Sequence, residues 1–309
     1  MSRVFVTGAS GFVGRALISK LTAAGHVVRI ALRKSPNPRM PDGVEILPQP
    51  DLAGPIDWKP MLAGTDVIVH LAGIAHAGAS IPESHYDRVN HRATAELATA
   101  AKEISPNRFV FISSIRAQSG PAADHILTEA DEPNPTDAYG RSKLAAEAAV
   151  RSAGIPFTVL RPVLVYGAGA KGNLASLVKL AASPWPLPFG AFDNRRSLAG
   201  LDNLIAAIMF AIENPAAVNE TYLVADPSAL TLAEIIATMR EALGRRPGMI
   251  SVPPKLFEAA FKVFGHANIW HRLGGSLVAT PDKLIAAGWR PQIETRAGLM
   301  AMVQTSIQR

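Results

Sequence analysis

The sequence contains no cysteine, which excludes disulfide bonds, thiolate nucleophiles and thiolate metal ligands. It also lacks a long apolar run: a membrane-spanning helix needs about 20 apolar residues, and the segment 66–79 is shorter and is broken by glycine and histidine. Charged residues make up only 18%, and their net charge of +6 is dispersed rather than gathered in runs. A strand pattern begins at residue 3, so we expect no signal peptide. These features predict a cytoplasmic globular protein that binds a small molecule, with no nucleic acid partner and no stable membrane insertion.

Histidine is more frequent in the first third of the chain, at His70, His76, His85 and His91. These residues do not combine with carboxylates at the spacings of known metal sites. We therefore predict structural histidines and no metal.

Strand and helix patterns alternate through the first half of the chain. Strands are predicted at 3–6, 27–32, 44–47, 67–71, 108–113 and 157–160, and helices at 12–24, 83–103 and 138–152. Such alternation predicts an α/β fold, a doubly wound Rossmann sheet with helices on both faces. Further helices are predicted at 203–213, 232–243, 252–265 and 282–287. We expect a dinucleotide-binding domain over 1–165, with returning segments near 195–225, and a smaller, interleaved substrate domain over most of 166–309.

Three glycines join the first strand to the first helix. Gly8 permits a tight turn, Gly11 lets the backbone approach a pyrophosphate, and Gly14 allows the helix to pack closely on the strand. The phosphates would then lie at the helix N-terminus, where Phe12 and Val13 begin the helix and free N–H groups favour an anion. A glycine triplet alone is a weak signal, but its position between a strand and a helix favours a dinucleotide site.

The end of the second strand indicates which dinucleotide is bound. NAD-binding members of this fold carry an acidic residue there for the ribose 2′-hydroxyl. This chain has Leu32, followed by Arg33 and Lys34. Because a guanidinium suits a 2′-phosphate and a carboxylate would repel it, we predict that NADP(H) is preferred, with NAD(H) as the alternative.

Tyr139 and Lys143 lie four residues apart, so a helix places them on one face. A nearby ammonium group is expected to lower the pKa of the Tyr139 phenol and make it a general acid or base at neutral pH. Ser113 and Ser114 end the fifth strand, where either hydroxyl could hydrogen-bond a reacting oxygen. The sequence thus predicts a catalytic site at the carboxyl ends of the strands.

Several segments together resemble the extended short-chain dehydrogenase/reductase family, of the epimerase/dehydratase type. They are TGASGFVG at 7–14, HLAG at 70–73, VN at 89–90, ISS at 112–114, YGRSK at 139–143, RPVLVYG at 161–167 and DN at 202–203. The resemblance covers nearly the whole chain and is greatest to nucleotide-sugar 4-ketoreductases and UDP-glucose 4-epimerases.

The resemblance implies a role for each matching residue. It makes Ser114, Tyr139 and Lys143 the catalytic residues, with Lys143 also binding the nicotinamide ribose. It places the cofactor against Gly8, Gly11, Phe12, Val13, Gly14, Arg33, Asp51, Leu52, Leu71, Ala72, Gly73, Asn90, Tyr139, Lys143, Pro162 and Val163. It places a UDP-sugar against Ser114, Tyr139, Asn173, Phe189, Arg196 and Arg272. It also implies a homodimer, to which the Phe- and Leu-rich segment 256–264 could contribute a helix.

Two departures from the family pattern refine the expected reaction: the serine segment continues to Ser119-Gly120 where the family has Tyr-Gly, and the Asp-Glu pair of the dehydratases is absent. Ser114 is preferred over Ser113 because it lies 25 residues before Tyr139, as in the epimerases. Dehydratases of this family have an Asp-Glu pair directly after the serine, where this chain has Ile115 and Arg116. We predict reduction of the 4-keto group of a UDP-6-deoxy-hexulose, with or without a 2-acetamido group. The alternatives are a UDP-sugar 4-epimerase with bound NAD and, more remotely, a non-catalytic dinucleotide sensor.

Overall fold

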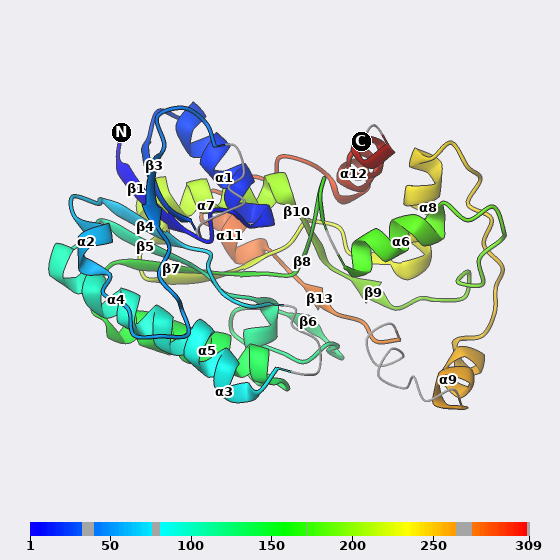
Figure 1. Ribbon diagram of the computed structural model, residues 1–309. Coiled ribbons are helices and arrows are strands. Elements are labelled where there is room, and N and C mark those ends of the chain that lie inside the picture. The colour runs from blue at the N-terminus through cyan, green and yellow to red at the C-terminus, as the bar shows by residue number, and fades with distance from the viewer. Residues whose placement is uncertain (33–39, 76–80, 171, 264–273, 308–309) are drawn as a thin grey trace.

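The computed structural model describes residues 1–32, 40–75, 81–170, 172–263 and 274–307. A seven-stranded parallel sheet in the order β11-β7-β5-β4-β1-β2-β3 forms the larger lobe (Figure 1). Its strands are β1 (Arg3–Thr7), β2 (Val27–Leu32), β3 (Glu45–Pro48), β4 (Val67–His70), β5 (Arg108–Ile112), β7 (Phe157–Pro162) and β11 (Glu220–Val224). The strand order reverses between β1 and β4, and sheets of this kind bind ligands beyond the carboxyl ends of the strands at such a point. The predicted α/β class and parallel sheet are confirmed.

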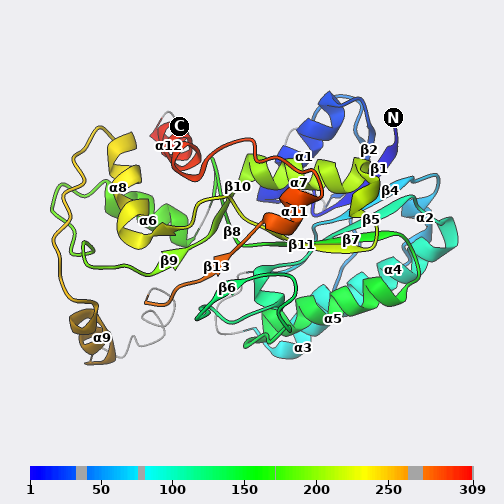
Figure 2. The ribbon, with the colours of Figure 1, turned by 180° about the vertical axis from the view of Figure 1, so that it is seen from behind.

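Helices cover both faces of this sheet (Figures 1 and 2). One face carries α1 (Phe12–Ala23), α7 (Leu201–Glu213) and α11 (Asp282–Ala286); the other carries α2 (Lys59–Leu62), α4 (Ala93–Ile104) and α5 (Ala138–Ser152). Alternate residues of β1 belong to opposite cores: Val4 and Val6 pack under α1 and α7, whereas Phe5 packs under α2 and α4. Because both faces are covered, the strands are apolar throughout rather than alternating.

A smaller lobe packs beyond the carboxyl end of the sheet. Its core lies among α6 (Asn173–Ala181), α8 (Leu232–Ala242) and α12 (Thr295–Ile307), with β9 (Arg195–Arg196) and β12 (Leu230–Thr231) beside them and α9 (Pro254–Val263) at the outer end. Short parallel pairs lie between the two lobes, formed by β8 (Leu164–Tyr166) with β10 (Leu198–Gly200) and by β6 (Ile126–Leu127) with β13 (Val278–Ala279). The Tyr166 hydroxyl donates to the buried Asp226 carboxylate over 2.7 Å, which fixes β8 to the segment that follows β11.

The structure differs from the sequence prediction in the segment 83–103. In place of one helix it has α3 (Glu83–Tyr86), a π-helical segment η1 (Asp87–Arg92) and α4. Segments of π-helix are rare in proteins, and those that occur often lie at functional sites. The elements that were not predicted include β11, α6, α12 and several short strands and turns of helix. The division into two domains stays a prediction; α7, β11 and α11 come after residue 166 and pack on the large sheet.

Within the part of the chain that the structure describes, no helix is both long and apolar enough to span a membrane. The same residues contain no group of three histidine, cysteine or carboxylate side chains suited to hold a metal ion.

Candidate active site

The glycine turn between β1 and α1 leaves no room for side chains. Gly8 has a φ of +71°, and a Cβ there would lie 2.7 Å from the Ala72 nitrogen. A Cβ on Gly14 would lie 2.3 Å from the Gly8 carbonyl oxygen, to which the Gly11 N–H also donates over 3.0 Å. The first turn of α1 has no side-chain cap and no acidic residue. Its N–H groups are therefore available to an anion such as a pyrophosphate.

His70 connects this turn to the neighbouring strand and helix. Its Nδ1 lies 2.7 Å from the Thr7 hydroxyl, its Nε2 lies 3.0 Å from the Thr94 hydroxyl, and its ring is fully buried. The Thr7 hydroxyl also accepts from the Ala72 N–H over 3.2 Å. Burial, with a contribution from the Lys143 charge, lowers the pKa of His70 to about 3. A neutral imidazole thus holds the end of β1 against the loop that follows β4.

Asn90, in the π-helical segment, holds this loop in place. Its Oδ1 accepts from the Ile74 N–H over 2.8 Å, and its Nδ2 donates to the Ile74 carbonyl and to the Ser142 hydroxyl, each over 3.0 Å. A Cβ on Gly73 would lie 2.8 Å from the Asn90 Oδ1 and 3.6 Å from the Lys143 Nζ. The loop after β4, the π-helical segment and α5 therefore meet at one point. That Asn90 lines the cofactor stays a prediction.

Tyr139 and Lys143 lie in the first two turns of α5, as predicted from their spacing. The Lys143 Nζ donates to the Ile112 carbonyl over 2.9 Å and lies 4.8 Å from the centre of the Phe111 ring. Burial lowers the pKa of Lys143 to about 8. Burial raises the pKa of Tyr139 to about 12, although its hydrogen bond with Ser114 acts in the opposite direction. The prediction that Tyr139 has a lowered pKa is therefore wrong for the protein alone: the Lys143 ammonium is held at the end of β5, and the phenol stays neutral.

The structure separates the roles of the two adjacent serines. The Ser113 hydroxyl is buried and donates to Glu147 over 2.5 Å. The Ser114 hydroxyl accepts from the Arg116 N–H over 3.2 Å and faces Tyr139, whose pKa it lowers. Only Ser114 is thus placed beside the phenol, which supports its choice over Ser113 as the catalytic serine.

Beneath these residues lies a buried ion pair that the sequence analysis missed. Glu147 is fully buried and accepts from the Arg161 Nε over 2.9 Å and from its Nη2 over 2.7 Å. A third donor is Arg151, at 3.0 Å, and the Arg161 Nη1 donates to Gln118 over 2.9 Å. The sequence did contain a signal for the burial of Glu147: it follows Lys143 by four residues in the predicted helix, so the two side chains share one face. The pair ties α5 to β7 directly below the two serines.

The other residues predicted to bind the cofactor lie at the same end of the sheet. The Asp51 carboxylate accepts from the Ala53 N–H over 3.0 Å in a turn beyond β3, and Leu52 packs in the core between the sheet and α4. Pro162 ends β7, and Val163 is buried between the lobes. Their contacts with a cofactor stay predictions, and Arg33 lies outside the described residues.

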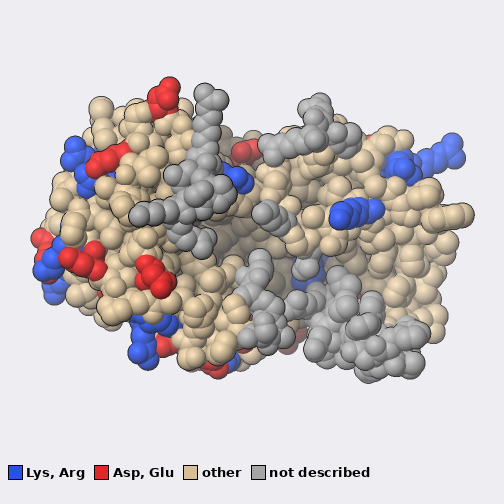
Figure 3. All heavy atoms as spheres, in the orientation of Figure 1, with Lys and Arg blue, Asp and Glu red and all other residues tan. Residues whose placement is uncertain are grey.

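The residues predicted to bind the substrate lie in the smaller lobe. Asn173 begins α6, and the ring of Phe189 packs against those of Phe192 and Phe257, with centroids 5.4 and 5.7 Å away. Arg196 lies in β9, where burial lowers the pKa of its guanidinium. Arg272 lies outside the described residues. Figure 3 shows the surface hollowed between the two lobes, with charged side chains of both signs interspersed over the larger one.

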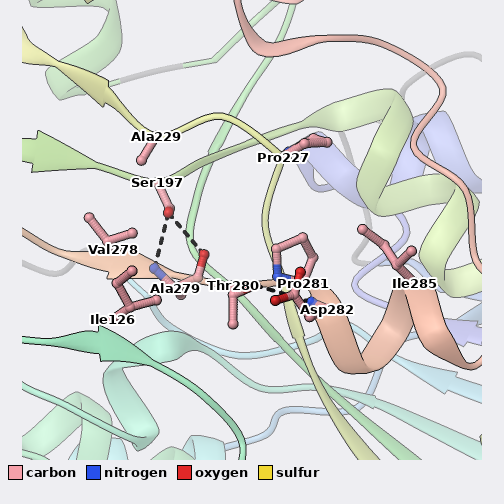
Figure 4. A pocket seen from close by; sticks show the side chains of 10 residues that line it. All are labelled: Ile126, Ser197, Pro227, Ala229, Val278, Ala279, Thr280, Pro281, Asp282 and Ile285. Atoms are coloured by element: carbon pink, nitrogen blue, oxygen red, sulfur yellow. Dashed lines mark hydrogen bonds between the residues drawn. The ribbon is translucent and has the colours of Figure 1, made fainter.

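A separate pocket lies between the β6–β13 pair and α11 (Figure 4). On one side the Ser197 hydroxyl donates to the Ala279 carbonyl and accepts from the Ala279 N–H, each over 3.0 Å. Most of the remaining lining is aliphatic or proline, as at Ile126, Pro227 and Val278, and it includes no predicted site residue. The pocket therefore offers little for acid–base chemistry, and the candidate active site remains the group around Tyr139.

Comparisons with known proteins agree with this arrangement. Residues 4–225 match the sequence model described as the NAD dependent epimerase/dehydratase family. The chain is 33% identical to a UDP-glucose 4-epimerase from Vibrio cholerae, over 99% of this chain and 95% of that protein. It is 28% identical to a ceramide reductase from Caulobacter vibrioides, over 93% of this chain and 86% of that one.

The fold is similar to that of solved epimerases. A UDP-glucuronic acid 4-epimerase from Bacillus cereus, solved in complex with NAD, superposes with a TM-score of 0.77, covers 99% of both chains and is 20% identical. The fold and the family match together show that the chain belongs to the NAD dependent epimerase/dehydratase family and is an NAD(P)-dependent enzyme of the extended short-chain dehydrogenase/reductase type.

Proposed function

We propose that the protein is a UDP-sugar 4-epimerase, which oxidises C4 of the sugar and reduces it again from the opposite face. The observation that carries this proposal is that Ser114, Tyr139 and Lys143 meet at the carboxyl end of β5, with Lys143 near the loop after β4 that the glycine turn also contacts. The similarity to a UDP-glucose 4-epimerase over nearly the whole of both chains supports the C4 reaction.

The glycine turn and the loop after β4 form a cradle that fits a dinucleotide. Side chains on Gly8 or Gly14 would collide with backbone atoms, and the uncapped N-terminus of α1 suits the pyrophosphate. Lys143, near Gly73, would hydrogen-bond the nicotinamide ribose. When bound, a nicotinamide dinucleotide would accept and return the hydride.

Tyr139 would exchange the proton of the sugar O4. In the protein alone its pKa is about 12, so the phenol is a proton donor at neutral pH. To act as a base it needs a second positive charge, and the positively charged nicotinamide ring of an oxidised cofactor would supply one beside Lys143. Ser114, which faces the phenol, would hold O4 in line with it. Arg196, Asn173, Phe189 and Arg272 are proposed to bind the UDP moiety, since a guanidinium pairs well with a diphosphate.

A second candidate is the NADPH-dependent reduction of a 4-keto group on a UDP-6-deoxy-hexulose, with or without a 2-acetamido group. Leu32 ends β2 in the place where an acidic residue would select NAD, and Arg33 and Lys34 follow it. The similarity to a reductase from Caulobacter vibrioides is compatible with this direction of reaction. Both candidates use the same three residues and differ in net consumption of cofactor.

The deciding experiment measures cofactor stoichiometry with UDP-sugars. An epimerase converts UDP-glucose or UDP-N-acetylglucosamine into the C4 isomer with no net change in absorbance at 340 nm. A reductase consumes one NADPH for each 4-keto substrate reduced and leaves the first two sugars unchanged. If neither reaction occurs while the protein still binds dinucleotide, the proposal fails in favour of a dinucleotide sensor.

Tyr139→Phe tests the residue that carries the chemistry. The variant should bind cofactor normally and lose turnover by a factor of at least about 100, as expected for a general acid–base residue. Tyr86→Phe is the matched control, because its ring packs against that of Tyr139 at a centroid distance of 6.2 Å. It should retain turnover. Near-normal turnover in Tyr139→Phe contradicts the assignment.

A further inference from the structure

Arg116 lies two residues after Ser114, in the short 3₁₀ helix η2 (Ile115–Ala117). The family resemblance gave it no role beyond disfavouring dehydration. Its backbone N–H donates to the Ser114 hydroxyl over 3.2 Å, and its Nη2 donates to the Asp137 carboxylate over 2.6 Å. One residue is thus bonded both to the candidate catalytic serine and to the residue that precedes α5.

Asp137 caps the helix that carries Tyr139. Its other carboxylate oxygen accepts from the Gly140 N–H over 2.7 Å, which makes it the N-cap of α5. The contact is close at the backbone too, because a Cβ on Gly140 would lie 2.2 Å from the Arg116 carbonyl oxygen. The Arg116–Asp137 ion pair therefore fixes the distance between the Ser114 loop and the first turn of α5.

The remaining terminal nitrogen of Arg116 is unused. Nη1 is buried and has no hydrogen-bond partner among the residues that the structure describes. The side chain as a whole is 21% exposed, and its charge acts on the Tyr139 phenol, so the guanidinium lies near the site rather than in the deep core. Buried donors of charged groups are normally satisfied, and a bound ligand satisfies them where the protein does not. An acceptor oxygen of a substrate beside Tyr139 is the partner that this position suits.

We propose that Arg116 is a further active-site residue: its Nη2 positions Ser114 against Tyr139 through Asp137, and its Nη1 donates to an oxygen of the bound sugar. The proposal rests on the proposed function for the identity of that sugar, but the positioning role is a property of the protein alone. It assigns to Arg116 two roles that different substitutions can separate.

The electrostatic contributions around Tyr139 make the proposal testable. The Arg116 charge lowers the pKa of Tyr139, and the Asp137 charge raises it. Other groups facing the phenol are Ser114, whose hydrogen bond lowers that pKa, and Tyr86 on α3, which raises it. Lys143 lies one turn further along α5. Removing Arg116 or Asp137 should therefore move the titration of Tyr139 in opposite directions.

The first experiment follows the Tyr139 phenol directly and needs no substrate. The chain has 4 tyrosines, so ¹³Cζ-labelled tyrosine gives few resonances, and Tyr139→Phe identifies the one required. In Arg116→Met the titration of Tyr139 should begin at a higher pH than in the wild type, and in Asp137→Asn at a lower pH. Asparagine is also a good N-cap, so the second variant keeps the helix start. Unmoved titrations, or shifts in the same direction, overturn the positioning role.

The second experiment tests the hydrogen bond to the sugar by steady-state kinetics with the UDP-sugar that the wild type converts. Arg116→Met should raise KM about tenfold or more, the loss expected when a charged donor is removed. Arg116→Lys keeps the charge but not the fork, so it should restore the Tyr139 titration and leave KM raised. Arg141→Met is the matched control, because that exposed guanidinium binds Glu83 at 2.7 Å and should change neither. An unchanged KM in Arg116→Met overturns the substrate contact.

These experiments fail independently of the proposed function. If no UDP-sugar is converted by the wild type, the proposed function fails while the tyrosine titrations still decide the positioning role. The substrate contact is then decided by calorimetric titration of UDP-glucose into the cofactor-loaded wild type and Arg116→Met. Equal affinities, or no binding to either protein, overturn that contact.

Discussion

His70 should make this protein sensitive to mild acid. The Thr94 hydroxyl donates to the Asn90 carbonyl over 2.6 Å, so it must accept from the His70 Nε2–H. Nδ1 is then the unprotonated nitrogen and accepts from the Thr7 hydroxyl over 2.7 Å, while Thr7 in turn accepts from the Ala72 N–H. A proton on Nδ1 would remove the acceptor and place a charge in a fully buried site.

The size of the effect follows from the pKa of His70, which is 6.5 as a reference and about 3 in the folded protein. Since the folded pKa is the lower one, the unfolded chain binds the proton first, and stability is lost as the pH falls from about 6.5 towards 3. Between pH 7 and pH 5 this single group should cost about 2 kcal/mol of unfolding free energy. That loss is a large fraction of the roughly 5–15 kcal/mol that stabilises a folded protein.

The assay is urea denaturation of the wild type and His70→Gln at pH 7 and pH 5. The variant should be less stable at pH 7, because it loses the two hydroxyl contacts, but it should lose about 2 kcal/mol less than the wild type on acidification. His125→Gln is the control of opposite sign: its exposed imidazole has a raised pKa because of its hydrogen bond to Asp124, so removing it should slightly increase the acid loss. An equal acid loss in the wild type and His70→Gln would refute the reasoning.

Three further predictions concern cofactor binding and the core. Gly14→Ala should weaken dinucleotide binding by at least about tenfold in a fluorescence titration, because its Cβ would lie 2.3 Å from a backbone oxygen of the turn, whereas Gly54→Ala, with 3.8 Å of clearance, should bind normally. Arg161→Met should lower the unfolding free energy by about 3–5 kcal/mol, because it leaves the buried Glu147 carboxylate without its main partner. Arg151→Met should lower it by less than about 1 kcal/mol, because that guanidinium is half-exposed. Equal losses in the two variants would contradict this account. The reductase candidate predicts that NADPH binds more tightly than NADH and that Arg33→Asp reverses the order; tighter NADH binding by the wild type would contradict that candidate.

Much of the fold was predictable because it is encoded over short stretches. Glycine is needed at position 14 because of atoms inside the turn itself, and Gly8 takes the positive φ of a tight turn, as expected; only the contact of Gly8 with the loop after β4 is long-range. The spacing of Tyr139 and Lys143 fixes their shared helical face regardless of the rest of the chain. Alternating strand and helix patterns likewise predicted six of the seven strands of the large sheet, namely β1, β2, β3, β4, β5 and β7.

The elements that were missed have weaker local patterns. The strand β11, with the sequence ETYLV, is too short for periodicity to assign, and it is a strand because it pairs with β7. In α12 the apolar residues are spread around the helix, which packs on α8 in the smaller lobe. The π-helical segment η1 reads as ordinary helix in the sequence, and the Asn90 contacts with Ile74 and Ser142 belong to residues 16 and 52 positions away.

The sequence by itself therefore determined six of the seven sheet strands, the glycine turn and the identity of the candidate catalytic residues. Only the tertiary structure decided that Ser114 and not Ser113 lies against Tyr139, and that the Lys143 amine is held at the Ile112 carbonyl. It also reversed the expected sign of the shift in the Tyr139 pKa. The physical reason is that helical and strand periodicity act over a few residues, whereas burial and the direction of a side chain depend on groups brought together from distant parts of the chain.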